Sequence, residues 1–130
     1  MIYLDTSAFV KLAWLEAETE RLLEFLADAA GTLVSSSLLT VEARRAALRR
    51  DPRLLPRVDV LLTDVGRIAV TDAVIHNASR LPDPSLRSLD VIHLATAALV
   101  GSELISLVTY DARMAATAAS LGLPVVAPGT

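Results

Sequence analysis

Short apolar runs alternate along this chain with longer segments in which apolar residues recur every three or four positions. The short runs lie at 2–4, 32–35, 67–70, 104–109 and 124–126, and their length predicts buried strands. The longer segments predict helices at about 6–14, 16–29, 37–50, 54–65, 71–81, 89–100 and 111–121. Strands that alternate with helices form a mainly parallel sheet, so the pattern predicts an α/β fold.

Polar residues and glycines mark the expected helix ends. Thr6 or Ser7 offers an N-cap for the first helix, because a side-chain oxygen can accept from a free amide of the first turn. Gly31 is expected to stop the second helix, and Gly122 follows the last one, where glycine tolerates a left-handed backbone. No repeat, low-complexity segment or linker interrupts the chain, so residues 1–130 are expected to form a single domain.

The composition limits the chemistry that the chain can carry. It has no cysteine and only two histidines, which excludes thiolate and histidine-rich metal sites and leaves oxygen ligands for Mg²⁺ or Mn²⁺. Hydrophobic residues make up 53% of the chain, yet no apolar run approaches the ~20 residues that span a bilayer. Met1 leads directly into a strand pattern without a basic segment, so we expect a cytoplasmic protein with no signal peptide and no membrane segment.

Four acidic residues lie beside predicted strand ends or helix starts, namely Asp5, Glu42, Asp90 and Asp111. Asp5 and Asp111 follow the first and fourth strands, while Glu42 and Asp90 lie in early turns of helices that begin at the same edge of the sheet. Ligands bind at the carboxyl edge of a parallel sheet, so the four can share a cavity if the first and fourth strands are neighbours. Taken singly, the three aspartates also suit helix N-termini, and Glu42 suits a solvated helix face.

Carboxylates that converge in this way raise each other's pKa unless a cation offsets their charge. Such a cluster could hold one or two Mg²⁺ or Mn²⁺ ions, which activate water and offset charge on a phosphodiester. Thr6, Ser7 and Thr109 could orient ligands or water there, or could serve only in caps and turns. No glycine-rich phosphate loop is present, and a phosphatase of the haloacid dehalogenase type would need an aspartate where Ser7 stands.

The basic residues are unevenly distributed, although the net charge of −3 does not indicate nucleic-acid binding. Six arginines lie between positions 44 and 57, with Asp51 as the only acid among them. This run is either a solvated helix face or a surface that contacts phosphates or a protein partner. Candidate RNA contacts are Arg44 and Arg45 in this run, Arg87 before the Asp90 helix, and Arg113 after Asp111.

The segments around the four acids also carry a family resemblance. They are Ile-Tyr-Leu-Asp5-Thr-Ser-Ala, Ser-Leu-Leu-Thr-Val-Glu42-Ala, Leu-Arg-Ser-Leu-Asp90-Val-Ile-His-Leu-Ala-Thr-Ala and Val-Thr-Tyr-Asp111-Ala-Arg-Met. In this order they resemble the acidic blocks of PIN-domain ribonucleases, and among these the VapC-type toxins of bacterial and archaeal toxin–antitoxin pairs. One block alone is weakly specific, but the four together span essentially the whole chain.

The resemblance implies a three-layer PIN-like domain with a five-stranded parallel sheet, order 3-2-1-4-5, flanked by helices. It implies a Mg²⁺- or Mn²⁺-dependent endoribonuclease in which Asp5, Glu42, Asp90 and Asp111 are the catalytic and metal-site acids. It further implies a homodimer that a cognate antitoxin neutralises. The alternative is a catalytically weak PIN-like module that acts mainly by binding the antitoxin.

Two further side chains have competing interpretations. His93 lies three residues after Asp90, and a core histidine with a local hydrogen bond is favoured over a general base. Trp14 is favoured as a core residue over an exposed contact for an antitoxin helix.

Overall fold

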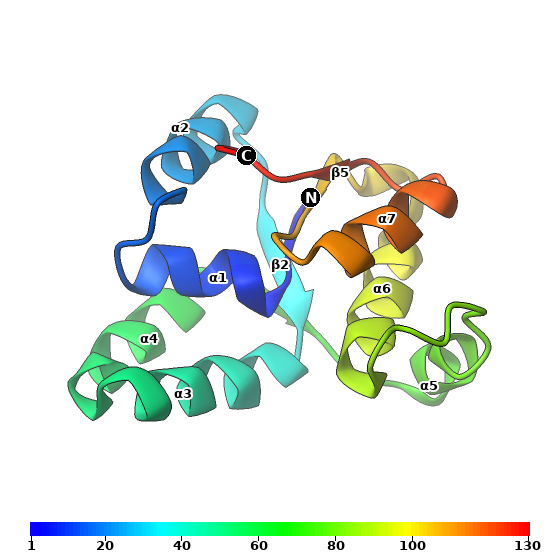
Figure 1. Ribbon diagram of the computed structural model, residues 1–130, viewed down its shortest axis with the longest axis horizontal. Helices are drawn as coiled ribbons and strands as arrows, with labels where there is room; N and C mark the ends of the chain where they lie inside the picture. Colours follow the sequence, from blue (N-terminus) through cyan, green and yellow to red (C-terminus); the bar gives the residue numbers. More distant parts are fainter.

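Five parallel strands form one sheet in the computed structural model, which describes residues 1–130 (Figure 1). The strands are β1 (Ile2–Leu4), β2 (Leu33–Ser36), β3 (Gly66–Ile68), β4 (Ser106–Val108) and β5 (Val125–Val126). Their order is β3-β2-β1-β4-β5, as the family resemblance implied. Tyr3 pairs with Val34 on one side and Leu107 on the other, so β1 and β4 are neighbours, which is the condition for bringing the acids together.

Helices flank this sheet on both sides. They are α1 (Thr6–Ala13), α2 (Thr19–Ala29), α3 (Leu38–Arg50), α4 (Leu55–Leu62), α5 (Asp72–Ala78), α6 (Ser88–Val100) and α7 (Ala112–Ser120), with 3₁₀ turns η1 (Pro52–Leu54) and η2 (Gly101–Glu103). Figure 1 shows α1 to α4 on one side of the central strands and α5 to α7 on the other. The α/β prediction with helices around a parallel sheet is confirmed. No helix combines the length and the apolar character that a membrane crossing requires.

The alternation of side chains along β1 divides the core between the two faces. Tyr3 is fully buried with residues of α6 and α7, such as Leu94 and Met114. Ile2 and Leu4 point the other way and pack with residues of α1 and α2. A third cluster joins α1, α3 and α4. Because β1 is buried on both faces, its length of three residues suffices to anchor the centre of the sheet.

The first helix begins differently from the prediction. Its N-cap is Asp5, whose carboxylate accepts from the Ala8 amide, so the expectation of a Thr6 or Ser7 cap is wrong. Both hydroxyls instead donate to carboxylates, Thr6 to Glu42 and Ser7 to Asp5. Asp5 is the cap because it directly precedes the first helical residue and has an extended backbone, which is the conformation of a capping residue.

The second helix differs from the prediction at its start. It starts at Thr19 rather than at 16, because Thr19 Oγ1 accepts from the Glu16 amide and donates to the Lys11 carbonyl, which closes a turn before the helix. It ends at Ala29, as predicted, and Ala30 directly after it takes a left-handed backbone with φ of 50°. Gly31 is needed for space, since a Cβ there would lie 2.9 Å from the Ile2 side chain.

Smaller boundary differences affect the later elements. β3 covers 66–68 rather than 67–70, and α5 ends at Ala78 rather than near 81. The edge position of β3 explains its shift, because only β2 dictates which of its residues pair. Gly122 follows α7 with φ of 77°, as predicted for a glycine beyond a helix end.

Candidate active site

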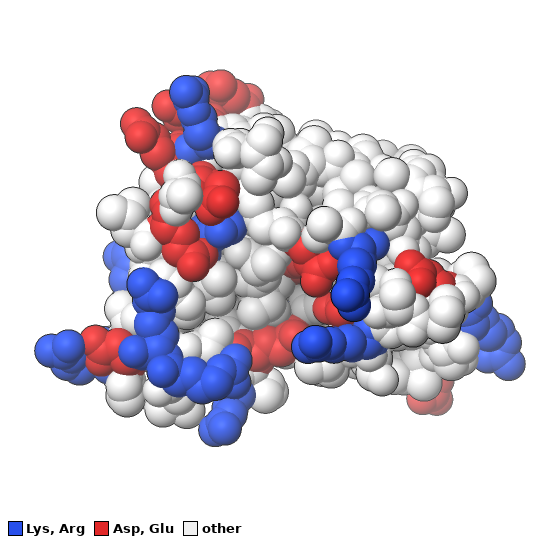
Figure 2. Space-filling view, in the orientation of Figure 1, with Lys and Arg blue, Asp and Glu red and all other residues white.

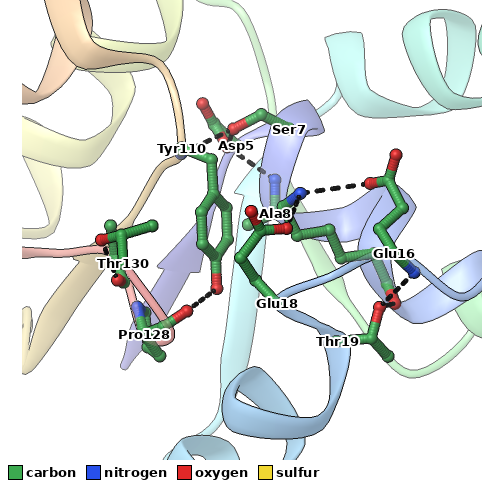
Figure 3. Close-up of polar contacts among 11 residues, drawn as sticks. Asp5, Ser7, Ala8, Glu16, Glu18, Thr19, Tyr110, Pro128 and Thr130 are labelled. Atoms are coloured by element: carbon green, nitrogen blue, oxygen red, sulfur yellow. Dashed lines mark hydrogen bonds and ion pairs between the residues drawn. The ribbon is translucent and has the colours of Figure 1, made fainter.

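Asp5 lies at the end of β1 and is held beneath the carboxyl edge of the sheet. Its Oδ1 accepts from Ser7 Oγ at 2.7 Å and from the Ala8 amide at 3.0 Å. Its Oδ2 accepts from Thr109 Oγ1 at 2.5 Å. Figure 3 shows Asp5 and Ser7 together at the start of α1. The side chain is 4% exposed, and burial raises its pKa while the bonds from Thr109, Ser7 and Ala8 lower it. The carboxylate is therefore fixed in position by three donors that favour its ionised form.

Glu42 lies on α3 and uses one carboxylate oxygen for two contacts within the protein. Its Oε1 accepts from Thr6 Oγ1 at 2.9 Å and lies 2.6 Å from His93 Nε2. The other ring nitrogen, Nδ1, lies 2.7 Å from the Tyr3 hydroxyl. No contact within the protein engages Oε2, so one oxygen of Glu42 stays available to a ligand.

Asp111 and Asp90 stand at the starts of α7 and α6. Asp111 Oδ1 accepts from the Met114 amide at 3.0 Å, and its own amide donates to Thr109 Oγ1 at 3.1 Å. Burial raises the pKa of Asp90, and the neighbouring carboxylates of Asp111 and Glu42 raise it further. Three negative groups from distant parts of the sequence therefore influence one another at this edge.

These side chains line an open pocket of about 750 Å³. Its walls include the carboxylates of Glu42, Asp90 and Asp111 and the side chains of Arg87 and Arg113. Figure 2 shows acidic side chains in the central hollow of this face, with basic side chains beside them.

Asp5 is not part of the pocket wall but is linked to it from behind. Thr109 connects it to Asp111, and Thr6, the next residue in the chain, connects the same strand end to Glu42. The structure thus brings three of the predicted acids to one pocket and places the fourth beneath them.

The oxygen-only donor set and the raised pKa of Asp90 fit a hard divalent cation, because a cation would offset the repulsion among the carboxylates. No three Asp, Glu, His or Cys side chains lie close enough to form a preassembled ligand cluster. The carboxylates around the pocket would form a complete ligand set only after one or more of them move toward the cation.

The predicted arginines fall into two groups. Arg87 and Arg113 line the pocket itself and form no ion pair within the protein. Arg45 is exposed on α3, whereas Arg44 is paired with Asp59 of α4. Arg44 is therefore less available to RNA than the sequence alone indicated.

His93 and Tyr3 were not among the predicted site residues. The prediction of a core histidine describes His93 correctly in that the side chain is 2% exposed, but its partner is the acid Glu42 rather than a local group. One signal in the sequence was available. Tyr3 lies in the middle of a buried strand, and a buried phenol needs a hydrogen-bond partner.

Comparison with known proteins places this geometry in a family. Residues 2–120 match the family model described as PIN domain. Ribonuclease VapC35 of Mycobacterium tuberculosis is 44% identical over 132 residues, which covers 99% of this chain and 98% of the relative. Ribonuclease VapC46 of the same organism is 40% identical over 127 residues, covering 98% of this chain and 97% of the relative.

Solved structures share the fold at lower sequence identity. A toxin–antitoxin complex from Klebsiella pneumoniae superposes with a TM-score of 0.74 at 22% identity, covering 98% of both chains. Mycobacterium tuberculosis VapC20, described as a Sarcin-Ricin loop cleaving toxin, gives a TM-score of 0.76 at 18% identity, covering 98% of this chain and all of that one. The chain belongs to the PIN domain family and, within it, to the VapC group.

Proposed function

We propose that this chain is an endoribonuclease toxin of a toxin–antitoxin pair, folded as one PIN domain over residues 1–130. The observation that carries the proposal is the pocket at the carboxyl edge, in which three carboxylates stand beside two arginines without ion pairs. The names of its VapC relatives support RNA as the substrate. An enzyme that acts on cellular RNA works in the cytoplasm, which is where we place it.

The four acids have separate roles in this proposal. Glu42, Asp90 and Asp111 face the pocket and would hold Mg²⁺ or Mn²⁺, while Asp5 would complete the site from beneath. Thr6, Ser7 and Thr109 hold the acids in place by donating to Glu42 and Asp5. When bound, a divalent cation lowers the pKa of a water molecule and offsets negative charge at a phosphodiester.

Arginines around the acids would bind the RNA backbone. Arg87 and Arg113 stand in the pocket wall, where a guanidinium can pair with a phosphate through two hydrogen bonds. Arg45 and Arg49 follow Glu42 by three and seven residues on α3, so they extend the same face of that helix away from the pocket. Figure 2 shows basic side chains over α3 and α4 as well as beside the hollow. We propose that an RNA strand runs from the pocket along this face.

The test is cleavage of an RNA pool by the purified protein with Mg²⁺, with Mn²⁺ or with EDTA. Wild type is expected to cleave only with a divalent ion, and Asp90→Asn is expected to lose the activity. Asp28→Asn removes an exposed carboxylate on α2 that forms no hydrogen bond or ion pair, so it serves as the matched control. Cleavage that persists in Asp90→Asn would contradict the proposed site.

A catalytically weak module remains the alternative because the acids are not preassembled as a ligand cluster. In that case the protein would bind its antitoxin but would cleave no RNA in any metal condition. The same cleavage assay, run beside an antitoxin-binding assay, separates the two functions.

We propose that the antitoxin binds in the groove of about 520 Å³ between α1, α2 and α4. Its lining is mostly apolar and includes Trp14, Leu15 and Leu23, of which Leu15 is 81% exposed and Leu23 53%. Arg57 stands at its margin and Arg50 lies over the Trp14 ring, so an occupant with apolar and acidic side chains would fit. A helix of the antitoxin has this chemistry when its apolar face carries acids at the edges. The Trp14 indole is half-buried against the core, so it forms the floor of the groove rather than a free contact.

We propose that a different apolar surface forms the interface of a homodimer. A second groove of about 300 Å³ is lined by residues of α5, α6 and the segment after α7, including Leu99 and Leu121, which are 50% and 44% exposed. Figure 2 shows a broad area without charged side chains over α7 and the chain that follows it. Apolar patches without charges at their centre are typical of homodimer interfaces.

Two substitutions test the roles of these two surfaces independently. Leu15→Glu is expected to abolish antitoxin capture while leaving RNA cleavage and the mass in solution unchanged. Leu99→Glu is expected to convert a dimer into a monomer while antitoxin capture persists. Capture that survives Leu15→Glu, or a mass that does not respond to Leu99→Glu, would refute the respective assignment.

A further inference from the structure

We propose that Tyr3 and His93 form a buried relay that positions Glu42 in the active site. The inference rests on the proposed function, because it assigns Glu42 a role in RNA cleavage. Three residues from three elements, β1, α6 and α3, line up through two short contacts, Tyr3 hydroxyl to His93 Nδ1 at 2.7 Å and His93 Nε2 to Glu42 Oε1 at 2.6 Å.

The direction of the hydrogen bonds follows from the phenol. Tyr3 is fully buried, and its phenol keeps its proton at neutral pH because a tyrosine hydroxyl has a pKa of about 10. We assign this proton to the contact with His93 Nδ1, which lies 2.7 Å from the hydroxyl oxygen. A neutral imidazole that accepts at Nδ1 carries its own proton on Nε2. His93 therefore donates from Nε2 to Glu42, which suits a carboxylate acceptor.

The consequence for Glu42 is a fixed orientation. Its Oε1 accepts from both His93 and Thr6, while Oε2 is left without a partner in the protein. Glu42 also lines the pocket, so the oxygen that is not held can face a ligand there. A glutamate has three side-chain torsions to order, and two donors on one oxygen remove most of that freedom before any ligand arrives.

The relay is anchored in the rigid part of the fold. Tyr3 is in the central strand, and the rings of Tyr3 and His93 pack edge to face with centroids 5.8 Å apart. His93 is 2% exposed, so solvent does not compete for its nitrogens. Neither residue reaches the pocket itself, so both are positioning residues rather than catalytic ones.

The first measurement examines the relay without metal and without RNA. Nitrogen-15 NMR of the imidazole in the metal-free protein reports which ring nitrogen carries the proton. The proposal expects a proton on Nε2 and none on Nδ1 in wild type. A ring that carries a proton on Nδ1 would overturn the direction of the relay, whatever the RNA assay shows.

The second measurement uses Tyr3→Phe, His93→Leu and His93→Gln in the RNA cleavage assay. His93→Leu removes the donor to Glu42 and is expected to lower kcat by about 10- to 100-fold, the range found for supporting groups of metal ligands, with little change in KM. His93→Gln keeps an amide donor near Nε2 and is expected to restore much of kcat. Tyr3→Phe removes a single buried oxygen and is expected to lower kcat about tenfold or less while the protein still folds.

Tyr110→Phe is the matched control for loss of a phenol. Figure 3 shows the Tyr110 hydroxyl directed toward Pro128, whose carbonyl accepts from it at 2.8 Å. This variant should leave kcat unchanged. If wild type cleaves RNA and the Tyr3 and His93 variants keep its kcat with only a lower Tm, the relay is wrong and the residues are structural. If wild type cleaves no RNA, the proposed function fails, while the NMR result still decides how Tyr3 and His93 are bonded.

Discussion

The hydroxyl of Thr109 offers the sharpest test of how the site is held together. It is fully buried, donates to Asp5 at 2.5 Å and accepts from the Asp111 amide at 3.1 Å. Thr109→Val keeps the branched shape and removes both bonds. A hydrogen bond to a charged group contributes about 1.5–3 kcal/mol, so we expect a loss of about 2 kcal/mol in the free energy of unfolding.

The loss can be converted into a melting temperature. A chain of 130 residues unfolds with an entropy of about 0.27 kcal/mol per kelvin, so 2 kcal/mol lowers Tm by about 7 °C. The expected loss depends on pH in a defined direction. Burial raises the pKa of Asp5 while the Thr109 bond lowers it, so removing Thr109 raises that pKa further. Ionised Asp5 loses the most, and the penalty therefore grows as the pH rises through the pKa of Asp5 and shrinks toward acid.

The assay is thermal unfolding of the metal-free protein, followed by circular dichroism at about pH 8 and about pH 4.5. Thr96→Val is the matched control, because Thr96 is equally buried but donates to a neutral carbonyl, that of Ile92. Its penalty should be about 1 kcal/mol or less and the same at both pH values. A Thr109→Val penalty no larger than the control, or one independent of pH, would refute the view that Thr109 supports an ionised Asp5.

Three further predictions concern the pocket and the sheet. In the metal-free protein, Asp90→Asn should raise Tm at neutral pH, because burial and the Asp111 carboxylate raise the pKa of Asp90, so that its ionised form opposes folding. The gain in unfolding free energy should stay below about 1 kcal/mol for this half-exposed group and should vanish as the pH falls below the pKa of Asp90 in the unfolded state. Gly31→Ala should cost about 1–3 kcal/mol in urea unfolding, since its Cβ would meet Ile2 at 2.9 Å, and an unchanged midpoint would show that Ile2 moves aside freely. Arg113→Ala should raise the KM for RNA and weaken its salt dependence, with Tm unaffected, and an unchanged KM would remove Arg113 from the RNA path.

Most helices and strands could be predicted from the sequence, because they depend on the local pattern of apolar and polar residues. Apolar runs located all five strands, and each helix was predicted within a few residues of its observed bounds. Predicted helix boundaries were wrong where a side chain forms a hydrogen bond that the local pattern of apolar residues does not indicate. Asp5 took the cap expected of Thr6 or Ser7, and the turn that Thr19 closes moved the start of the second helix from 16 to 19.

The acids could be assigned to one edge of the sheet from the sequence, since every parallel strand ends there and every following helix begins there. Their convergence also required β1 and β4 to be neighbours, a strand order that the family resemblance implied and the structure shows. The sequence did not indicate which of the acids would face a pocket and which would lie beneath it. Their burial depends on how the helices pack over the edge of the sheet. Only the folded chain placed Asp5 at 4% exposure behind the other three.

The supporting contacts were decided by tertiary structure alone. Thr109 meets Asp5 across 104 residues, Tyr3 meets His93 across 90, and His93 meets Glu42 across 51. Composition and spacing carry no information about such pairs, because each depends on strand order and on the direction in which a side chain leaves its element. The sequence by itself determined the fold class and the identity of the acids, and the packing of α6 on the central strand and of α3 on α1 determined how those acids are held.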